Sequence, residues 1–574
     1  FIQTKEPSSI SVNAEFAQLV PGTSNVVQGD GTSFIDDFEN TATPYSLMSP
    51  ISWRLSATPK DLKFDESTSF GPNDVAAGYR RAKLSWYNID NLWYRQISRF
   101  KPEYLSTEVV NSNHYTRAVQ QQEIFPGRDR QIGNFYEPIF DLAYYPSERG
   151  PYNYNSRSSD LTPEGFFRYP EQNWAGITTS IRNEVDWDKA NVEYIEFWML
   201  DPFINDPKSL IDDGINTPKA NTTGGKLIFH MGSISEDVMR DGKHAFENGL
   251  PADGNVAGGE VTENEWGYVT TRQYLNNAFD ISAASRVNQD VGLDGAGNEQ
   301  EKTKFNSFLN ALPPAARTKQ EADPSSDDFK YTLGAEYDTK KAGLLERYKN
   351  FMGMENNSPV SSNNDAFPKS NYTTPDNEDL NQDNTLSDLE EYYTYSMDLR
   401  PGQLAVGNKF IVDAIRPTAS TLPPEVNPEL WYLVRIPVRQ FESKVGDING
   451  FKSIRYVRMI MTGFKEPIVL RLSNFRAVGN RWRRYTANLE DARFGEPLEP
   501  NLDNYSVSVV NVEENSAASD NKPPYVEPLR RDRDNTSTLP RRLNEQAVQL
   551  CVNDLQDGDA RAIYKNVSFD LFNY

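Results

Sequence analysis

The sequence predicts a mainly β protein, built around a β-sandwich that carries long irregular and partly helical insertions. Three observations lead to this fold class. Short β-prone runs, separated by Pro and Ser, occur in both the first and the later part of the chain. One of them, residues 192–200, carries large apolar groups on both faces, as expected for a central strand covered on both sides. Between the two parts, residues 235–390 are rich in Asp, Asn, Gly, Glu and Ser.

The composition narrows the class of protein. The chain has 574 residues and a mass of 65.2 kDa, which at roughly 100–200 residues per domain predicts several domains or fewer very large ones. It contains 59 Lys and Arg against 82 Asp and Glu, and the net charge of −23 disfavours binding to nucleic acid or anionic lipid. Aromatic residues make up 12% of the chain although the mean hydropathy is −0.68, which argues against global disorder.

Cysteine content and apolar runs set further limits. The single Cys551 excludes an intrachain disulfide framework and any metal site with several Cys ligands. No apolar run reaches the roughly 18–20 residues of a membrane-spanning helix, and the chain starts at Phe1 without a signal peptide. We therefore expect this chain to be a piece of a larger protein.

The first part of the chain is expected to supply the first strands of the sandwich. Residues 1–33 mix Pro, Ser, Gly and Asn without a sustained period and are interpreted as a linker or the tail of a preceding element. The β-prone runs that follow lie at 34–39, 52–55, 82–87, 177–182, 192–200 and 226–231. Residues 235–390 are interpreted as an acidic insertion with a helix-compatible stretch at 340–351.

Strand character returns in the later part of the chain. Runs at 431–438, 453–461 and 468–478 alternate cleanly enough to form one side of a sandwich, and Pro437 places the first of them near an edge. Residues 487–543 are rich in Pro, Asn and charge and are interpreted as a linker. Residues 544–574 then resemble the start of a further β domain that is truncated at the C-terminus.

The residues offer little support for catalysis, and we expect no enzyme activity. No nucleophile-elbow motif accompanies the three histidines, His114, His230 and His244. A glycosidase-like pair of carboxylates is conceivable, but spacing in sequence shows neither of the separations that such chemistry needs. The candidates are Asp36, Asp37 and Glu39 on one side and Glu193, Glu196 and Asp201 on the other. Solvated or loop-capping carboxylates are the preferred interpretation in so acidic a chain.

The sharpest local pattern is an acidic loop at residues 379–390. Oxygen donors occupy loop positions 1, 3, 5, 7 and 9, and a glutamate occupies position 12, which matches the way an EF-hand loop wraps Ca²⁺. Asn384 stands where Gly is usual, and Asn is among the residues best able to take a left-handed conformation. The alternative is an Asn/Asp turn without metal, and we expect any bound Ca²⁺ to be structural. The predicted ligands are Asp379, Asn381, Asp383, Thr385, Ser387 and Glu390.

A weaker version of this loop lies at residues 290–301. Asp290, Asp294 and Glu301 occupy positions 1, 5 and 12, but Gly292 replaces the ligand at position 3. An acidic turn without metal is again the alternative.

Arginines cluster near the end of the strand-rich part. They could meet an acidic partner or lipopolysaccharide, but alternation in the strands makes an outward, solvated face the preferred interpretation. Exposed Tyr and Trp could form a sugar platform, whereas core packing is the default for strand aromatics. The cluster comprises Arg455, Arg458, Arg471, Arg476, Arg481, Arg483 and Arg484.

Several segments resemble the SprA/Sov family, the outer-membrane translocon of the type IX secretion system of Bacteroidetes-type bacteria. The resemblance runs in pieces from the region of residue 34 to the C-terminus. It implies a very long chain that builds a giant transmembrane β-barrel with large extramembrane domains, of which this chain is a part. The segments are IDDFE at 35–39, YYPSERGPYN at 144–153, VEYIEFW at 192–198, GGKL at 224–227, DLNQDNTLSDLE at 379–390, FKSIRYVRMIMTGF at 451–464 and LQDGDARA at 555–562.

The segments 36–39 and 471–485 also resemble the first and last strands of a jelly roll of the carbohydrate-binding-module type. This resemblance implies that residues 34–234 and 391–486 form one discontinuous, jelly-roll-like β-sandwich, with residues 235–390 as its insertion. Short strands buried on both faces fit a sandwich better than a lipid-facing barrel wall.

The resemblance implies a structural, extramembrane portion of a protein-export channel at the outer membrane, which shapes the pore and docks partner proteins. The implied partners are secreted cargo proteins and other translocon subunits, in a system of protein secretion and gliding motility. The alternative is a carbohydrate-binding or glycoside-hydrolysing surface protein of jelly-roll type. An exposed Tyr/Trp platform, or two carboxylates facing each other across a cleft, would favour that alternative.

Overall fold

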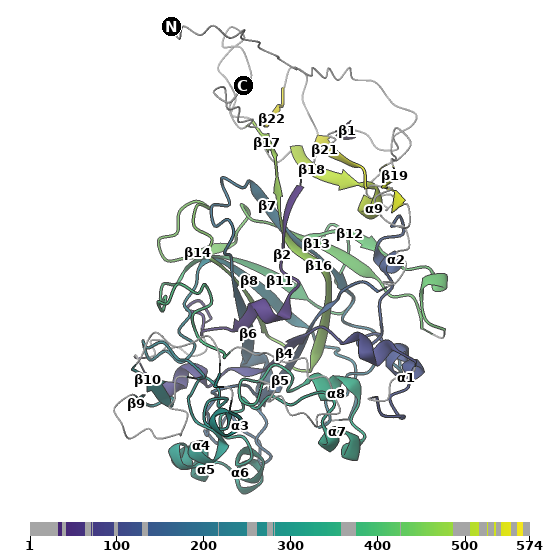
Figure 1. The fold of residues 1–574 in the computed structure, drawn as a ribbon. Helices are drawn as coiled ribbons and strands as arrows, with labels where there is room; N and C mark the ends of the chain where they lie inside the picture. Colours follow the sequence, from purple (N-terminus) through teal and green to yellow (C-terminus); the bar gives the residue numbers. More distant parts are fainter. Residues whose placement is uncertain are drawn as a thin grey trace, which may run out of the picture.

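Two antiparallel β-sheets that pack face to face dominate the structure, which is a computed structural model (Figure 1). The fold is mainly β with helical insertions, as the sequence predicts. The structure describes residues 32–36, 42–62, 71, 73–96, 101–128, 136–215, 217–248, 261–271, 279–280, 282–357, 375–424, 426–485, 505–515, 525, 533–534, 541–542, 544–552 and 560–565.

All strands of the two main sheets come from residues 42–233 and 391–480. The first sheet has the order β14 (Ser443–Val445), β11 (Glu391–Leu399), β8 (Gly225–Ser233), β15 (Tyr456–Thr462), β6 (Trp174–Ser180) and β3 (Trp53–Leu55). The second has the order β12 (Ile411–Ile415), β13 (Trp431–Pro437), β7 (Val192–Leu200), β16 (Ile468–Asn480), β5 (Phe140–Arg149) and β4 (Ala82–Tyr87), and β2 (Ala42–Ser46) pairs with β16.

Strand β7 lies between β13 and β16 and is buried on both faces. Ile195, Phe197 and Met199 belong to the core between the two sheets, whereas Trp198 and Leu200 belong to a second core on the opposite face. The prediction of a central strand covered on both sides is therefore confirmed. Each face of β7 removes large apolar side chains from water, which is the main driving force for packing in such a sandwich.

Short helices cover the second face of this sheet. Val110 of α1 (Thr107–Ser112) and Ile124 of α2 (Gln121–Ile124) pack there, together with Leu344 and Leu345 of α8 (Leu344–Tyr348). Helix α1 starts at a serine cap, because Ser106 Oγ accepts a hydrogen bond from the Val109 N–H at 3.3 Å. The helices thus close off the side of the sandwich that the first sheet leaves open.

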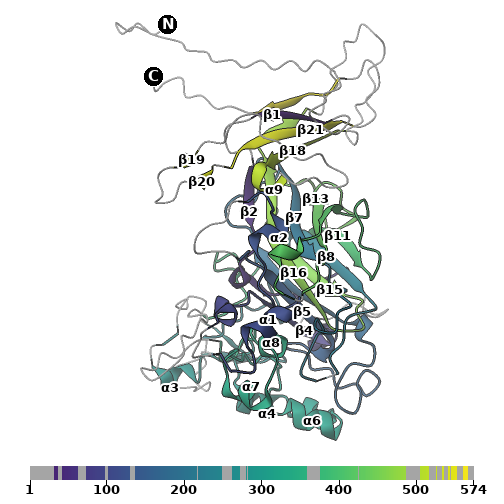
Figure 2. The same ribbon diagram turned by 90° about the vertical axis from the view of Figure 1, so that its right-hand side faces the viewer.

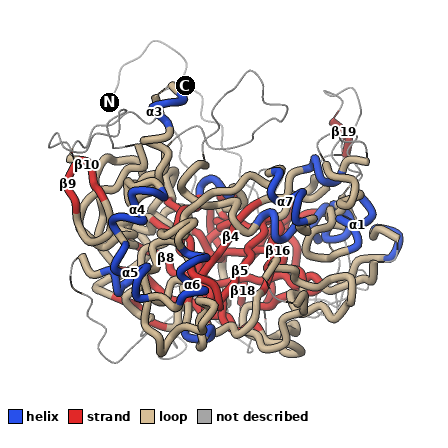
Figure 3. The backbone as a smooth tube through the Cα atoms, turned by 90° about the horizontal axis from the view of Figure 1, so that it is seen from below, coloured by secondary structure: helices blue, strands red, loops and turns tan. Residues whose placement is uncertain are grey.

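Most of the remaining helices belong to the insertion and gather at one end of the sandwich (Figures 1 and 3). Tyr152 and Tyr154, which follow β5, join this region to the sandwich, and the Tyr154 ring stacks on Phe305 with centroids 4.1 Å apart. The elements here are β9 (Val261–Glu263), β10 (Tyr268–Thr270), α3 (Ala283–Arg286), α4 (Asn298–Lys304), α5 (Asn306–Ala311), α6 (Pro314–Gln320) and α7 (Ala335–Lys340).

A small three-stranded sheet lies at the opposite end of the sandwich (Figure 2). Its order is β1 (Thr32–Asp36), β21 (Gln546–Val552) and β18 (Tyr505–Asn511), followed by α9 (Val512–Asn515). This corrects two expectations. The run from residue 34 pairs with β21 and not with the sandwich, and residues 487–543 are not only a linker, because β18 lies within them. The physical reason is that β21 satisfies its backbone hydrogen bonds on both edges.

The other described elements are short. Strands pair as β17 (Trp482–Arg484) with β22 (Ile563–Lys565) and β19 (Arg533–Asp534) with β20 (Arg541–Arg542). The 3-10 helices are η1 (Pro50–Ser52), η2 (Val75–Gly78), η3 (Asn91–Tyr94), η4 (Pro170–Gln172) and η6 (Ala419–Thr421). Among the helices of the described ranges, none has the length and hydropathy needed to cross a bilayer.

The arginine cluster is not the solvated face that strand alternation predicts. Arg458 and Arg471 are 0% and 1% exposed, whereas Arg455 and Arg481 are exposed. The prediction was wrong for the buried residues because carboxylates distant in sequence lie beside them, and a buried guanidinium requires such a counter-charge. The ion pairs are Arg458–Glu390, Arg471–Asp141, Arg476–Glu196 and Arg476–Glu514.

Gly225 at the start of β8 lets a buried aromatic ring pack against the backbone. A Cβ at Gly225 would lie 2.4 Å from Cδ2 of Phe464, which is 0% exposed. We expect Gly225→Ala to lower the free energy of unfolding by about 1–3 kcal/mol, as overpacking does in tight cores. Urea unfolding measures this change. Gly71→Ala is the matched control, since a Cβ there meets nothing within 4 Å, and equal stability of the two variants would contradict the close packing.

Candidate metal centre

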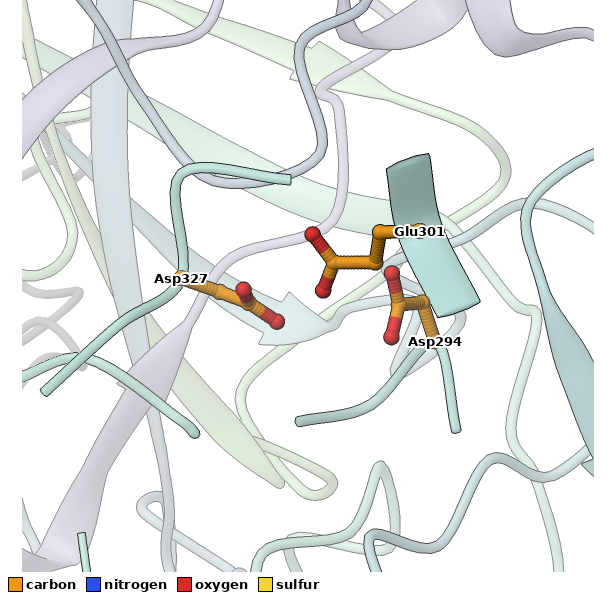
Figure 4. A group of neighbouring side chains, drawn as sticks. All are labelled: Asp294, Glu301 and Asp327. Atoms are coloured by element: carbon orange, nitrogen blue, oxygen red, sulfur yellow. The ribbon is translucent and has the colours of Figure 1, made fainter. Parts of the chain in front are cut away.

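Three buried carboxylates from separate segments meet in the insertion (Figure 4). Asp294 lies in the loop before α4, Glu301 in α4, and Asp327 in the loop after α6. One carboxylate oxygen from each residue lies within 4.8 Å of one from each of the others. Within the part of the chain that the structure describes, no other three His, Cys, Asp or Glu side chains come this close together.

The local sequence turns the chain tightly around Asp294. Gly292 and Gly295 have φ values of +76° and +66°, in the left-handed region that glycine adopts without a steric cost. Asp294 Oδ1 accepts a hydrogen bond from the Ala296 N–H at 3.0 Å, which leads the chain into α4. Glu301 lies one turn inside that helix, so loop and helix direct two carboxylates toward Asp327 (Figure 4).

Asp327 is held in place through its backbone. Its carbonyl oxygen accepts hydrogen bonds from the N–H groups of Met354 and Glu355 at 2.6 and 3.0 Å, and its own N–H donates to Asp323 Oδ1 at 3.0 Å. These bonds fix the position of the residue. Its carboxylate lies near the Tyr152 hydroxyl, which interacts with it.

The carboxylates differ in how far the protein satisfies them. Asp294 Oδ2 accepts from Ser325 Oγ at 2.6 Å, and Glu301 Oε2 accepts from the Ser325 N–H at 2.9 Å. Glu301 Oε1 and both carboxylate oxygens of Asp327 have no hydrogen-bond partner. The three side chains belong to residues that are 2%, 0% and 0% exposed, for Asp294, Glu301 and Asp327 respectively, so bulk water does not replace the missing partners.

Burial and mutual repulsion raise the pKa values of the cluster. Burial raises the pKa of Asp294 to about 7. Burial first, and then the charges of Asp294 and Glu355, raise the pKa of Glu301 to about 11. Burial and the charge of Glu301 raise the pKa of Asp327 well above its usual range. Without a cation, the three groups therefore cannot all be ionised at neutral pH.

The cluster contains two of the residues predicted for the weaker loop at 290–301. Positions 5 and 12, Asp294 and Glu301, come together, but position 1 does not join them. Asp290 instead accepts a hydrogen bond from the Asn357 N–H at 3.2 Å. The third carboxylate, Asp327, comes from outside the loop, and sequence reasoning missed it because no local spacing links it to residues 290–301.

The loop at 379–390 is arranged differently. The carboxylate of Glu236, which is 1% exposed, accepts hydrogen bonds from the N–H groups of Leu380 at 2.8 Å and Ser387 at 3.1 Å. Asp379 likewise accepts from the N–H groups of the residues that follow it, including Asn384 at 2.7 Å. Asn384 has a φ of 63°, the left-handed conformation that the sequence suggests. The loop thus directs backbone N–H groups, and not oxygen atoms, at the carboxylates of Glu236 and Asp379.

The six predicted ligands of this loop are not brought together around one point. Glu390 is buried and forms an ion pair with Arg458 at 2.9 Å. Asp383 and Thr385 are exposed, whereas Asn381 and Ser387 are half-buried. Asp383 Oδ1 accepts a hydrogen bond from the Thr385 N–H at 2.9 Å. Calcium binding at this loop remains a prediction, and the engagement of Glu390 with Arg458 argues against it.

The candidate catalytic residues are dispersed. His114 and His230 are buried, and His230 Nε2 lies 3.1 Å from Asp61 Oδ2. Glu196 pairs with Arg435 and Arg476, which lower the pKa of its buried carboxyl to about 2. Burial raises the pKa of Glu193 to about 7, and Asp201 accepts a hydrogen bond from the Phe203 N–H. Asp37, Glu39 and the side chain of Asp36 lie outside the described residues.

In the presence of a chelator, Asp294 should make the stability of the protein fall as pH rises. The folded state holds this proton up to a pKa of about 7, whereas an unfolded Asp releases it near its usual value of 3.8. The free energy of unfolding therefore decreases with pH across this window, by up to about 1.4 kcal/mol per pH unit. His114 acts in the opposite direction, because burial lowers its pKa to about 3. Urea unfolding of the wild type and of Asp294→Asn at several pH values isolates the Asp294 contribution. Identical slopes would contradict it.

A comparison with protein families shows what the later part of the chain is similar to. Residues 304–574 match the SprA_N family, which is described as a motility related/secretion protein. The match includes Asp327, the later sandwich strands β11 to β16 and the strands β18 and β21 of the small sheet. A search of curated proteins found no match. The match over residues 304–574 supports the assignment to the SprA/Sov family and relates this part of the chain to proteins of motility and secretion.

Proposed function

We propose that the chain is a structural, extramembrane portion of a protein-export channel, the type IX secretion translocon, where it shapes the pore and docks partner proteins. The match of residues 304–574 to a family of motility related and secretion proteins is the observation that carries this proposal. On this proposal, the partners are secreted cargo proteins and other translocon subunits, and the rest of the protein holds this portion at the outer membrane.

The packing of the sandwich suits a rigid wall or gate. The two sheets share one aromatic core, and buried ion pairs link strands within and beyond them. Truncating one partner of such a pair is costly, so the arrangement resists local rearrangement. The net charge of −23 also suits a channel lining, because it limits the non-specific adhesion of cargo.

The alternative, a carbohydrate-binding or glycoside-hydrolysing protein, finds less support. All nine tryptophans lie in described ranges, and eight are buried while Trp482 is half-buried. Tyr485 and Tyr564 are 39% and 41% exposed, but their rings meet edge to face at 82° and do not form a flat platform. Glu196, one of the candidate carboxylates, is neutralised by two arginines.

Site-directed crosslinking in the whole protein, in the bacterium that makes it, tests the proposal. Cys551→Ser removes the only cysteine of the 574 residues, and any cysteine in the rest of the protein is replaced in the same way. Single cysteines are then introduced at Ile51, Val287 and Phe441, which are 61%, 76% and 40% exposed. We expect at least one position to crosslink to an exported protein or a translocon subunit while cargo is held in the channel. The absence of crosslinks from every position in cells that export normally would contradict the proposal. Binding of the 574-residue chain to an array of glycans would favour the alternative.

A further inference from the structure

We propose that the carboxylates of Asp294, Glu301 and Asp327 bind one Ca²⁺ ion, which fixes the acidic insertion to the sandwich. This site is distinct from the loop at 379–390, and the proposal does not depend on a role in protein export. It starts from the convergence of the three side chains, which point toward one another from three segments (Figure 4).

The cluster offers fewer hydrogen-bond donors than its carboxylate oxygens need. Both carboxylate oxygens of Asp327, and Oε1 of Glu301, are buried without a hydrogen bond of 3.5 Å or less, and both residues are 0% exposed. The Tyr152 hydroxyl interacts with Asp327 but carries no charge to balance it. Buried polar atoms in native proteins are almost always satisfied by protein groups, ordered water or an ion. Because these oxygens converge on the side chain of Asp294, a cation held between them would satisfy all of them together.

Negative charge accumulates at the cluster. In the described part of the chain, no Lys or Arg lies within ion-pair distance of any of the three carboxylates. Lys304, which follows Glu301 in α4, attracts Asp294 only from a longer distance and forms its ion pair with Glu263. Asp323 and Glu355 lie close enough to add further negative charge. Buried carboxylates are normally paired or bound to a metal, so a divalent cation is the counter-charge that this cluster requires.

Asp327 approaches the loop at Gly292. A Cβ at this position would lie 2.1 Å from Oδ2 of Asp327, so the carboxylate occupies the space that a side chain at loop position 3 would fill. Asp327 thus approaches from a distant segment at the point where the loop lacks a ligand. The pattern Asp294, Glu301 and Gly292, which is an incomplete calcium loop by itself, becomes a three-carboxylate site once Asp327 is added.

The ligand atoms favour calcium among the common ions. The three side chains offer only oxygen atoms, which disfavours Zn²⁺ and Cu²⁺ relative to hard cations. Mg²⁺ usually keeps several of its waters, whereas all three residues here are buried. Ca²⁺ accepts six to eight oxygen ligands in irregular geometry, including bidentate carboxylates.

Such an ion would stabilise the attachment of the insertion. Ser325, which donates to Asp294 and Glu301, also accepts through its carbonyl oxygen a hydrogen bond from the Tyr152 N–H at 2.8 Å. The Tyr152 hydroxyl accepts a hydrogen bond from the Leu293 N–H at 2.9 Å. Tyr152 follows β5 of the sandwich. Ser325 would therefore connect the ligands of the ion directly to the contact between the insertion and the sandwich.

Calorimetric titration of the chelator-treated 574-residue chain with CaCl₂ tests the proposal. We expect one Ca²⁺ per chain at this site, and we expect Asp327→Asn and Glu301→Gln each to weaken it by more than about 10-fold, since ligand charge sets affinity at such sites. Asp383→Asn, which removes an exposed carboxylate from the loop at 379–390, is the matched control and should leave this affinity unchanged. Competition with MgCl₂ reports the preference for Ca²⁺.

Hydrogen exchange on the wild type keeps the test independent of folding defects in the variants. Ca²⁺ should slow amide hydrogen exchange of the wild type in residues 290–330. In a separate melting experiment, Asp327→Asn should melt at a higher temperature than the wild type in chelator but at a lower one in Ca²⁺. The reversal follows because the variant removes a carboxyl group that must take up a proton to be buried without the ion, and in Ca²⁺ it removes a ligand. No Ca²⁺ binding by the wild type, exchange slowed only at residues 379–390, or binding lost in Asp383→Asn but kept in Asp327→Asn would overturn the proposal.

Discussion

Replacing Glu390 by Gln is expected to lower the free energy of unfolding by about 3–5 kcal/mol, because it leaves the Arg458 guanidinium buried without its main counter-charge. Arg458 is 0% exposed, and its Nη1 and Nη2 donate to the two carboxylate oxygens of Glu390 at 2.9 and 3.2 Å. Nε of Arg458 donates to His230 Nδ1, which is neutral because burial lowers the pKa of this histidine. His230 therefore cannot replace the lost negative charge.

Urea unfolding with Ca²⁺ and with a chelator measures this effect and separates the two roles considered for Glu390. If Glu390 is the structural counter-ion of Arg458, its replacement by Gln destabilises the protein equally with Ca²⁺ and with a chelator. A calcium ligand would show its loss only in the presence of Ca²⁺, and that outcome would contradict the ion-pair interpretation. Asp383→Asn, in the same loop but exposed, is the control and should change the stability by less than about 0.5 kcal/mol.

The strands of the sandwich could be predicted from the sequence because their side chains alternate with a period of two. The run predicted at 431–438 corresponds to β13 (Trp431–Pro437), the run at 453–461 to β15 (Tyr456–Thr462) and the run at 468–478 to β16 (Ile468–Asn480). Large apolar groups on both faces of residues 192–200 also indicated a central strand correctly. Local periodicity reports which face of an element is buried, and that information is present in a single segment.

The partners of these strands could not be predicted in the same way. The alternation of Tyr505, Val507 and Val509 with serines marks a strand, but the surrounding Pro, Asn and charged residues conceal it, and only its pairing with β21 gives it a place. Arg471 likewise looks like a surface residue until Asp141, on the neighbouring strand β5, supplies its counter-charge at 2.9 Å. Burial of a charge depends on contacts between distant segments, which no single run records.

The candidate metal centre could likewise be predicted only in part. Asp294 and Glu301 belong to a loop whose spacing is visible in the sequence, and the turn that joins them needs only local conformations at Gly292 and Gly295. Asp327 is brought to them by backbone hydrogen bonds from Met354 and Glu355. The stronger sequence pattern at 379–390 folds around the carboxylate of Glu236, another distant residue. Spacing alone therefore could not decide between a cation and an anion at the centre of either loop.

Phe475→Ala is expected to cost about 3–5 kcal/mol, because Phe475 joins the two sheets through a group of aromatic rings. The residue is 0% exposed on β16, and its ring centroid lies 5.8 Å from Trp53 and 6.3 Å from Phe229, both of the opposite sheet. Within its own sheet, the ring lies 5.5 Å from Phe197 in an edge-to-face arrangement. Truncation to Ala would remove the ring from this group and leave a cavity that strands held on both sides cannot close.

Urea unfolding of Phe475→Ala, beside the less severe Phe475→Leu, measures how far the sandwich depends on this ring. Leu keeps most of the buried apolar volume and loses only the ring contacts, so its cost should be clearly smaller. Val287→Ala, at a position that is 76% exposed, is the surface control and should change the stability by less than about 0.5 kcal/mol. A loss below about 1 kcal/mol for Phe475→Ala would mean that the sheets repack around the cavity, and the core would then be too plastic to serve as the rigid wall that the proposed export function requires.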